Sequence, residues 1–268
     1  MHLPTINHID LSLIKNFPML SLTSSVNLQR LDISCLMLEE DGPEIAVQSE
    51  MMPKIRDFHT SDSSLLTTNL LLAIRQDGQP AFNFMDLRRL TISSACPEDE
   101  WNIRYLLQNA KLLEKLHLSV GLSWGLVGLH DILSPSASTL KILHLTVSLD
   151  VGLPLAGLCD ELEAMAGHNM LEALSFLVRV DGDESEDSIG PIIQNVEKVL
   201  VKPGWCALKQ VSFELAIACC QVSREDSAKL SEALQSLPDK YLTHLSKLES
   251  VAFNFSAYVV ECIFDIEL

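Results

Sequence analysis

The chain has 268 residues, 47% of them hydrophobic, which is enough apolar material for a large core and argues against disorder. Its 19 Lys and Arg residues against 36 Asp and Glu residues give a formal net charge of −17, which disfavours nucleic acid and anionic membranes as partners. Seven scattered cysteines without a Cys-x-x-Cys spacing, no signal-peptide pattern and no long apolar run together predict a soluble protein of the cytoplasm or nucleus.

One short pattern, Leu-x-x-Leu-x-Leu, recurs along the chain and is clearest at 113–120 and 140–147. Its apolar and polar residues alternate as in a strand with one buried face and one face in water. Eight copies keep one phase, and a ninth, Met52/Ile55, is imperfect because Asp57 stands where an apolar residue is expected; Phe58 would serve if the strand bulged by one residue. The nine copies start near residues 6, 28, 52, 87, 113, 140, 171, 208 and 248.

Successive copies start 22 to 40 residues apart, whereas leucine-rich repeats run to about 20–29 residues, so the longer intervals should hold longer helices or loops. The apolar spacing between strands becomes helical, which predicts short helices over 64–74, 98–110, 126–133, 155–166, 190–201 and 224–234, with a further helical turn in 238–245. The early intervals 14–21 and 37–48 contain Pro18 and Pro43, and they predict turns or 3₁₀ segments.

These elements predict an α/β leucine-rich-repeat solenoid, a horseshoe with one curved parallel sheet and with short helices and turns on its outer side. All of 1–268 is expected to form this single irregular domain of about nine repeats.

The phased strands, the segment 57–61 with the Leu-rich helix that follows, and the segment 84–93 resemble the irregular leucine-rich-repeat region of fungal F-box proteins. The resemblance spans most of the chain. It implies a substrate-binding part of a ubiquitin-ligase adaptor, in which an F-box docks the ligase through Skp1. The repeats here begin by Ile6, so a link to a Skp1–cullin complex is expected only if an F-box is supplied elsewhere.

In such a fold the alternate strand residues outside the core line the concave face. The third place of successive copies gives His8, Arg30, Lys54, Arg89, Lys115, Ile142, Ala173, Gln210 and Ser250, and the fifth gives Asp10, Asp32, Arg56, Thr91, His117, His144, Ser175, Ser212 and Ala252. The expected partner-binding residues are Arg30, Lys54, Arg56, Arg89, Lys115, His117 and His144, which would attract an acidic or phosphorylated segment. Alternatively, the cations only solvate the sheet and protect its edges.

The sequence offers no catalytic motif: it lacks a Gly-x-Ser-x-Gly elbow, a phosphate-binding loop and a His-Glu-x-x-His pair. His117 and His144 lack further ligands at zinc spacing, and the acidic segment 181–187 departs from a calcium loop because Glu186 stands in place of the turn glycine. We therefore expect no metal, no cofactor and no enzymatic activity.

The sequence is best interpreted as a protein–protein recognition module that binds its partner on the concave sheet. The alternative is a structural or regulatory scaffold that acts through acidic loops, such as 39–44 and 181–187, without any link to a ubiquitin ligase. A third hypothesis is an ordinary α/β enzyme in which the repeats are accidental. The alternation of polar and apolar residues in the strands disfavours this hypothesis.

Overall fold

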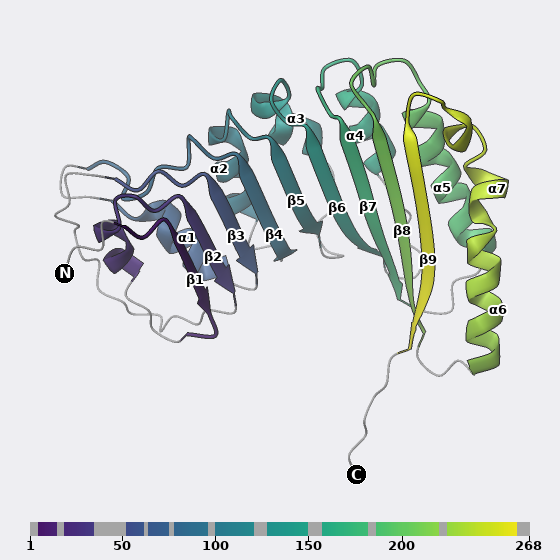
Figure 1. Cartoon of the computed structure of the whole chain (residues 1–268), viewed down its shortest axis with the longest axis horizontal. Helices are drawn as coiled ribbons and strands as arrows, with labels where there is room; N and C mark the ends of the chain where they lie inside the picture. Colours follow the sequence, from purple (N-terminus) through teal and green to yellow (C-terminus); the bar gives the residue numbers. More distant parts are fainter. Residues whose placement is uncertain are drawn as a thin grey trace, which may run out of the picture. The chain divides into compact units, whose positions relative to one another are not determined.

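The computed structural model describes residues 5–14, 19–34, 52–61, 64–74, 78–95, 100–120, 128–149, 157–181, 186–219 and 224–261. It is an α/β structure whose nine described strands form one sheet in sequence order, β1 to β9, with parallel pairing (Figure 1). The prediction of an α/β fold with a parallel sheet and short helices is confirmed.

The chain packs as two compact units. Unit 1 comprises Met1–Ser119 with Ile132–Leu140, and unit 2 comprises Val120–Asp131 with Lys141–Leu268. The described elements of unit 1 are β1 (His8–Ser12), η1 (Met19–Ser24), β2 (Arg30–Ser34), β3 (Asp57–Ser61), α1 (Ser64–Leu72), β4 (Arg89–Ala95), α2 (Glu100–Asn109), β5 (Lys115–Val120, ending in unit 2) and η3 (Ser134–Ser136).

The described elements of unit 2 are β6 (Ile142–Leu149), α4 (Leu158–Met165), β7 (Ala173–Asp181), α5 (Glu186–Leu200), β8 (Gln210–Cys219), α6 (Arg224–Gln235), α7 (Leu237–Tyr241), η4 (Leu245–Lys247) and β9 (Ala252–Glu261). The helix α3 (Leu129–Leu133) is divided between the units. The helices that the sequence predicts are present with boundaries shifted by up to four residues. The 3₁₀ helix η1 overlaps the first predicted interval of turns or 3₁₀ segments at 19–21, and 15–18 lie outside the described residues. The predicted interval 37–48 lies outside the described residues.

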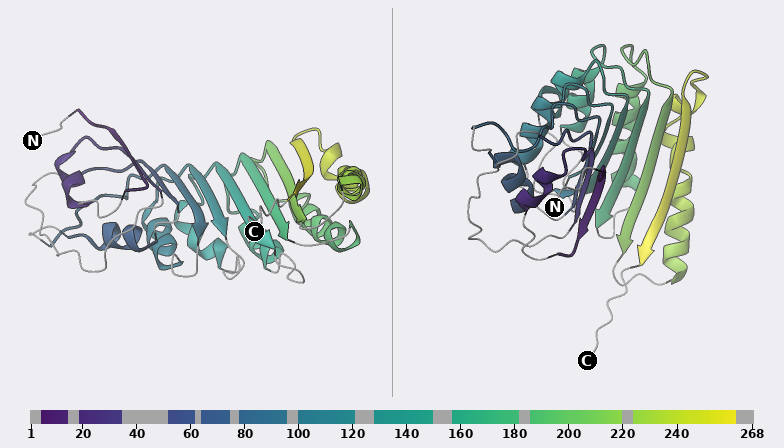
Figure 2. Two further views of the ribbon diagram at one scale, coloured as in Figure 1. Left: turned by 90° about the horizontal axis from the view of Figure 1, so that it is seen from below. Right: turned by 60° about the vertical axis from the view of Figure 1, so that its left-hand side comes forward.

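The core of unit 1 lies between its strands and the helices on one face of them (Figure 2). From β2 to β5 the first, fourth and sixth places of the repeated pattern are buried, as in Leu28, Leu31 and Ile33, which are all 0% exposed, whereas in β1 only the sixth-place Leu11 is buried. Because side chains alternate along a strand, the residues between them point to the opposite face.

The predicted register is wrong for two strands, β3 and β9. Phe58 of β3 pairs with Leu31 and Leu90, so the third repeat starts at Ile55, which is fully buried, and not near Met52. No bulge is needed, since Thr60 occupies the sixth place. The apolar pattern failed there because Thr60 is polar; its hydroxyl is buried against Thr67 of α1, with 3.0 Å between the two oxygens.

In β9, Phe253 pairs with Val211, two residues later than the pattern predicts. A shift of two residues keeps the same side chains on the same face, because the period of a strand is two. The aromatic residues of unit 2 follow this register: the rings of Phe176 and Phe213 lie 5.9 Å apart, and those of Phe213 and Phe255 lie 6.1 Å apart. These three rings form a row across β7, β8 and β9.

The edge strand β9 is contacted by α6. The amide of Ala252 donates to the carbonyl of Lys209, the residue just before β8, so the carbonyls of odd-numbered residues of β9 point away from β8. One of these outward carbonyls, that of Ala257, accepts a hydrogen bond from the Gln235 side chain at the end of α6. The helix therefore satisfies part of a sheet edge that would otherwise be open to another strand.

Candidate functional site

The candidate site is the side of the unit 1 strands that faces away from the core. We define the polar face as the third, fifth and seventh places of β1 to β5. These are His8, Asp10 and Ser12; Arg30, Asp32 and Ser34; Asp57, His59 and Ser61; Arg89, Thr91 and Ser93; and Lys115, His117 and Ser119. None of these residues is buried, and no side chain among them is aliphatic.

The pairing of neighbouring strands places residues of the same place in the pattern side by side. Arg30 pairs with Asp57 and Asp57 with Arg89 across the third place. The amide of Lys115 donates to the Arg88 carbonyl, in the same way that the amide of Arg89 donates to the Arg56 carbonyl, so Lys115 stands beside Arg89. Neighbouring side chains in this row are separated by about one strand spacing, 4.8 Å.

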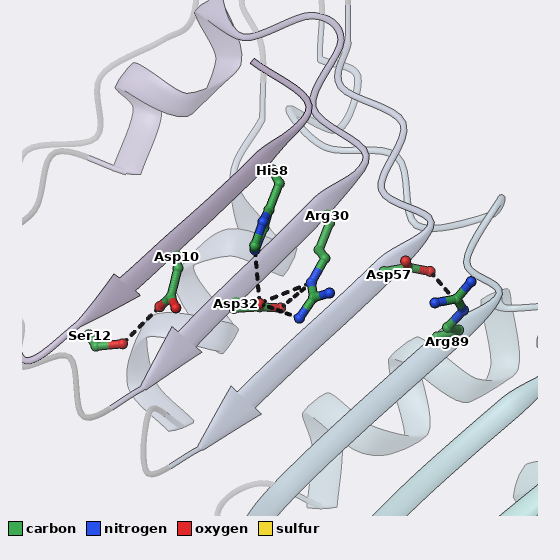
Figure 3. A network of polar contacts seen from close by, with 7 residues as sticks. All are labelled: His8, Asp10, Ser12, Arg30, Asp32, Asp57 and Arg89. Carbon is green, nitrogen blue, oxygen red and sulfur yellow. Dashed lines mark hydrogen bonds and ion pairs between the residues drawn. The ribbon is translucent and has the colours of Figure 1, made fainter.

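An ion-pair network connects β1 and β2 on the polar face (Figure 3). The Arg30 guanidinium donates to both carboxylate oxygens of Asp32, with Nη2 2.8 Å and Nε 3.0 Å from Oδ2. His8 Nε2 lies 3.0 Å from the same Oδ2. The Asp32 side chain is only 14% exposed, because its neighbours cover it. Asp32 thus joins two basic side chains from adjacent strands.

The pKa values of both Asp32 and Arg30 are shifted by their surroundings. Burial acts to raise the pKa of Asp32, but the hydrogen bonds from Arg30 and His8, with the charge of Arg30, outweigh it, and the pKa of that carboxyl lies below its ordinary value. The hydrogen bond to Asp32, followed by the negative charge of Asp32, raises the pKa of Arg30. The pair is therefore charged across the whole physiological pH range.

Asp32 makes the stability of unit 1 sensitive to acid. Its folded pKa lies below the unfolded value of about 3.9, so its ion pairs stabilise the native state above that pH and are lost as the pH falls through the folded pKa. We expect Asp32→Asn to lower the free energy of unfolding by about 1 kcal/mol at pH 7 and by progressively less below pH ~4. Urea unfolding at a series of pH values measures this, with the exposed Asp239→Asn as the control. A difference that stays constant down to pH ~3 would contradict the assignment.

The remaining charges are compensated unequally. Asp57 Oδ1 lies 3.6 Å from Arg89 Nε, a longer contact than that of Arg30, and the Arg89 side chain is 66% exposed. Arg88, just before β4, pairs with Glu114 at 2.8 Å. Within the described part of the chain, Lys115 makes no ion pair. Positive charge is therefore concentrated at Arg89 and Lys115.

The structure changes the set of candidate residues that the sequence predicts. Arg30, Arg89, Lys115 and His117 lie on the polar face, but Lys54 and Arg56 do not, because the repeat starts at Ile55. Lys54 forms an isolated bridge with Asn83 before β3. Asp57 and His59 occupy the predicted places of Lys54 and Arg56, so the expected basic column is interrupted by an acid. His144 lies on β6 of unit 2, whereas His117 belongs to unit 1.

The polar face also carries a column of serines that was not predicted from the sequence. Ser12, Ser34, Ser61 and Ser93 pair in register at the seventh place, and Ser119 follows at the same place of β5. Their signal was present in the sequence as one serine three residues after each fourth-place apolar residue. The Ser12 hydroxyl donates to Asp10 Oδ1 at 2.8 Å, which connects the column to the acidic side of the face.

Other predicted features are located as follows. The acidic segment 39–44 and most of the segment 181–187 lie outside the described residues. Among the residues that the structure does describe, no three His, Cys, Asp or Glu side chains gather as a metal site would require. No helix in the described ranges has both the length and the apolar character needed to cross a membrane.

No protein-family model and no curated protein matches the chain.

Proposed function

We propose that this chain is a protein-recognition module without enzymatic activity, built as a leucine-rich-repeat solenoid, that binds a partner protein on its polar face. The observation that carries the proposal is the polar face itself. Five parallel strands present charged and hydrogen-bonding side chains in register, and none of these side chains is buried.

The backbone beneath this face is held rigidly, which favours recognition. Each strand is hydrogen-bonded to its neighbour, and its alternate residues are anchored in the core by buried Leu, Ile and Phe side chains. Side chains on a fixed framework lose less conformational freedom on binding than side chains on a loop, so more of the interaction energy remains as affinity.

Charge supports a protein partner over nucleic acid. The whole chain carries −17, and the acidic side chains of the polar face, Asp10, Asp32 and Asp57, equal its Arg and Lys residues in number. A nucleic-acid surface would need a continuous positive strip. The resemblance to the repeat region of fungal F-box proteins agrees with a role in selecting a protein substrate for a larger complex.

Photo-crosslinking tests the proposal. A photoreactive amino acid at Thr91, in the centre of the polar face, should crosslink to another protein in a lysate of the native cells. The matched control carries the same amino acid at Gln194, an exposed residue of α5 in unit 2. Selective crosslinking from Thr91 supports the proposal, whereas equal labelling from both positions, or none, contradicts it.

Charge reversal measures the contribution of the exposed cations. We expect Arg89→Glu/Lys115→Glu to slow association with the crosslinked protein by about tenfold at low salt and to weaken its salt dependence. The control, Lys111→Glu/Lys247→Glu, changes the net charge equally at exposed residues outside the polar face. Stopped-flow or surface-plasmon association rates measure both variants. Equal rates for the two variants would show that net charge, and not this face, controls the encounter.

A further inference from the structure

Charge on the polar face is separated along the strand order. At one end, Asp10 of β1 accepts a hydrogen bond from Ser12 and makes no ion pair among the described residues, and the charge of Arg30 acts on it only as the weakest of the contributions to the raised pKa of Arg30. In the middle, Arg30 and His8 are both bonded to Asp32. The carboxylate of Asp10 on β1 is therefore the least compensated negative charge of the polar face.

At the other end, Arg89 and Lys115 stand side by side on β4 and β5. Like charges directly opposite each other on adjacent strands repel and destabilise the pair. Asp57 relieves only one side of Arg89, at 3.6 Å. An anionic group placed between Arg89 and Lys115 would remove this repulsion, so the structure favours an anion there.

We propose that the polar face accepts an extended peptide segment that crosses the strands, with acidic side chains at Arg89 and Lys115 and a basic side chain at Asp10. This inference rests on the proposed function and specifies the chemistry of its partner. The positive and negative groups of the polar face lie at opposite ends of the strand order. The face therefore selects segments whose acidic and basic residues are grouped at opposite ends, and not segments in which the charges alternate.

The strand spacing sets the separation of the two groups. From β1 to β4 there are three spacings, or about 14 Å, and from β1 to β5 there are four, or about 19 Å. An extended peptide advances about 3.3 Å per residue, so the basic residue should lie about four to six residues from the acidic pair. The neutral interval would lie across Arg30 and Asp32, whose opposite charges are paired with each other.

The serine column crosses the same five strands at the seventh place, two residues after the fifth place of each strand. Serine hydroxyls both donate and accept hydrogen bonds. They can therefore serve the backbone of a segment that crosses the strands without demanding a particular side chain in its neutral interval.

Labelled synthetic peptides test this inference directly. The grouped peptide carries Glu-Glu, four neutral residues and Lys; the dispersed peptide has the same composition with the charges alternating; and a third peptide replaces the Lys by Ala. A fourth replaces both Glu by phosphoserine, which separates carboxylate from phosphate as the source of the anion. Fluorescence anisotropy at about 20 mM salt, where screening acts over about 20 Å, gives the four affinities for the full chain.

We expect the grouped peptide to bind at least tenfold more tightly than the dispersed one, and either anion source to satisfy the proposal. Arg89→Glu/Lys115→Glu should abolish this preference. Asp10→Asn should remove only the gain that Lys gives over Ala, while Asp239→Asn should change nothing. A second readout, urea unfolding, verifies that each variant is folded.

Three results would overturn the inference: equal affinity for grouped and dispersed peptides, equal affinity for the Lys and Ala peptides, or no binding of any peptide. Each leaves the photo-crosslinking from Thr91 unaffected. If that crosslink persists while the peptides fail, the face binds a protein through another chemistry. If no protein crosslinks there, the proposed function itself fails.

Discussion

Replacing Glu197 by alanine is expected to lower the free energy of unfolding by about 3 kcal/mol. Glu197 lies on α5 with its side chain 5% exposed, and its Oε1 accepts hydrogen bonds from the amides of His244 at 2.7 Å and Leu245 at 3.0 Å. Its other oxygen lies 3.3 Å from His244 Nδ1. Alanine would leave two amides of the turn before β9 without their acceptor, and Leu245 is buried.

Glu197→Gln retains one oxygen that can accept from both amides, so it should cost less, about 1 kcal/mol. Glu163→Gln on α4 is the matched control, since Glu163 is exposed and pairs with Lys202 at the surface. Urea unfolding measures all three, and hydrogen exchange should show the loss of protection concentrated in 245–261. If alanine and glutamine cost the same, the two amides are not what Glu197 stabilises.

Replacing Gly190 by alanine should destabilise unit 2 by about 2 kcal/mol, although the same change inside an ordinary helix stabilises it by about 1 kcal/mol. The ring of Tyr241 lies against Gly190, so a Cβ there would be 2.5 Å from Tyr241 Cε2 and 2.8 Å from Cε1. These distances are far inside van der Waals contact, so the Tyr241 ring, or α7 with it, must shift to make room.

A double-mutant cycle isolates this contact. In the background of Tyr241→Ala, the Gly190→Ala change should become neutral or stabilising, which gives a coupling energy of about 2–3 kcal/mol with the wild-type background. Thermal or urea unfolding of the four proteins measures it. If Gly190→Ala costs the same in both backgrounds, the tyrosine ring does not set the distance between α5 and α7.

The alternation of apolar and polar residues was sufficient to predict the strands and their two faces. This information is local, because the period of two follows from backbone geometry at each residue. It placed Arg30, Arg89, Lys115 and His117 on the side away from the core, and the structure agrees. The helical spacing between strands was equally local, which is why each predicted helix is present with only its boundaries shifted.

The register of β3 depended on a contact that the local pattern does not contain. Thr60 takes a core place because α1 supplies Thr67 as its hydrogen-bond partner, and without that partner a buried hydroxyl would be unfavourable. The consequence for the site is large, since the shift replaces Lys54 and Arg56 by Asp57 and His59. A face that reads as basic in the sequence is balanced in the structure.

By itself, the sequence determined the α/β class, the order of the elements and which strand faces meet water, because these follow from residue periodicity along the chain. Only the tertiary structure decided which charges on the polar face remain available. Arg30 is held by Asp32 two residues away, but Asp57 meets Arg89 across strands separated by 32 residues of sequence, and Glu197 reaches amides 47 and 48 residues away. Ion pairs and buried hydrogen bonds act through space over a few ångströms, so the folded register, and not the sequence spacing, selects the partners.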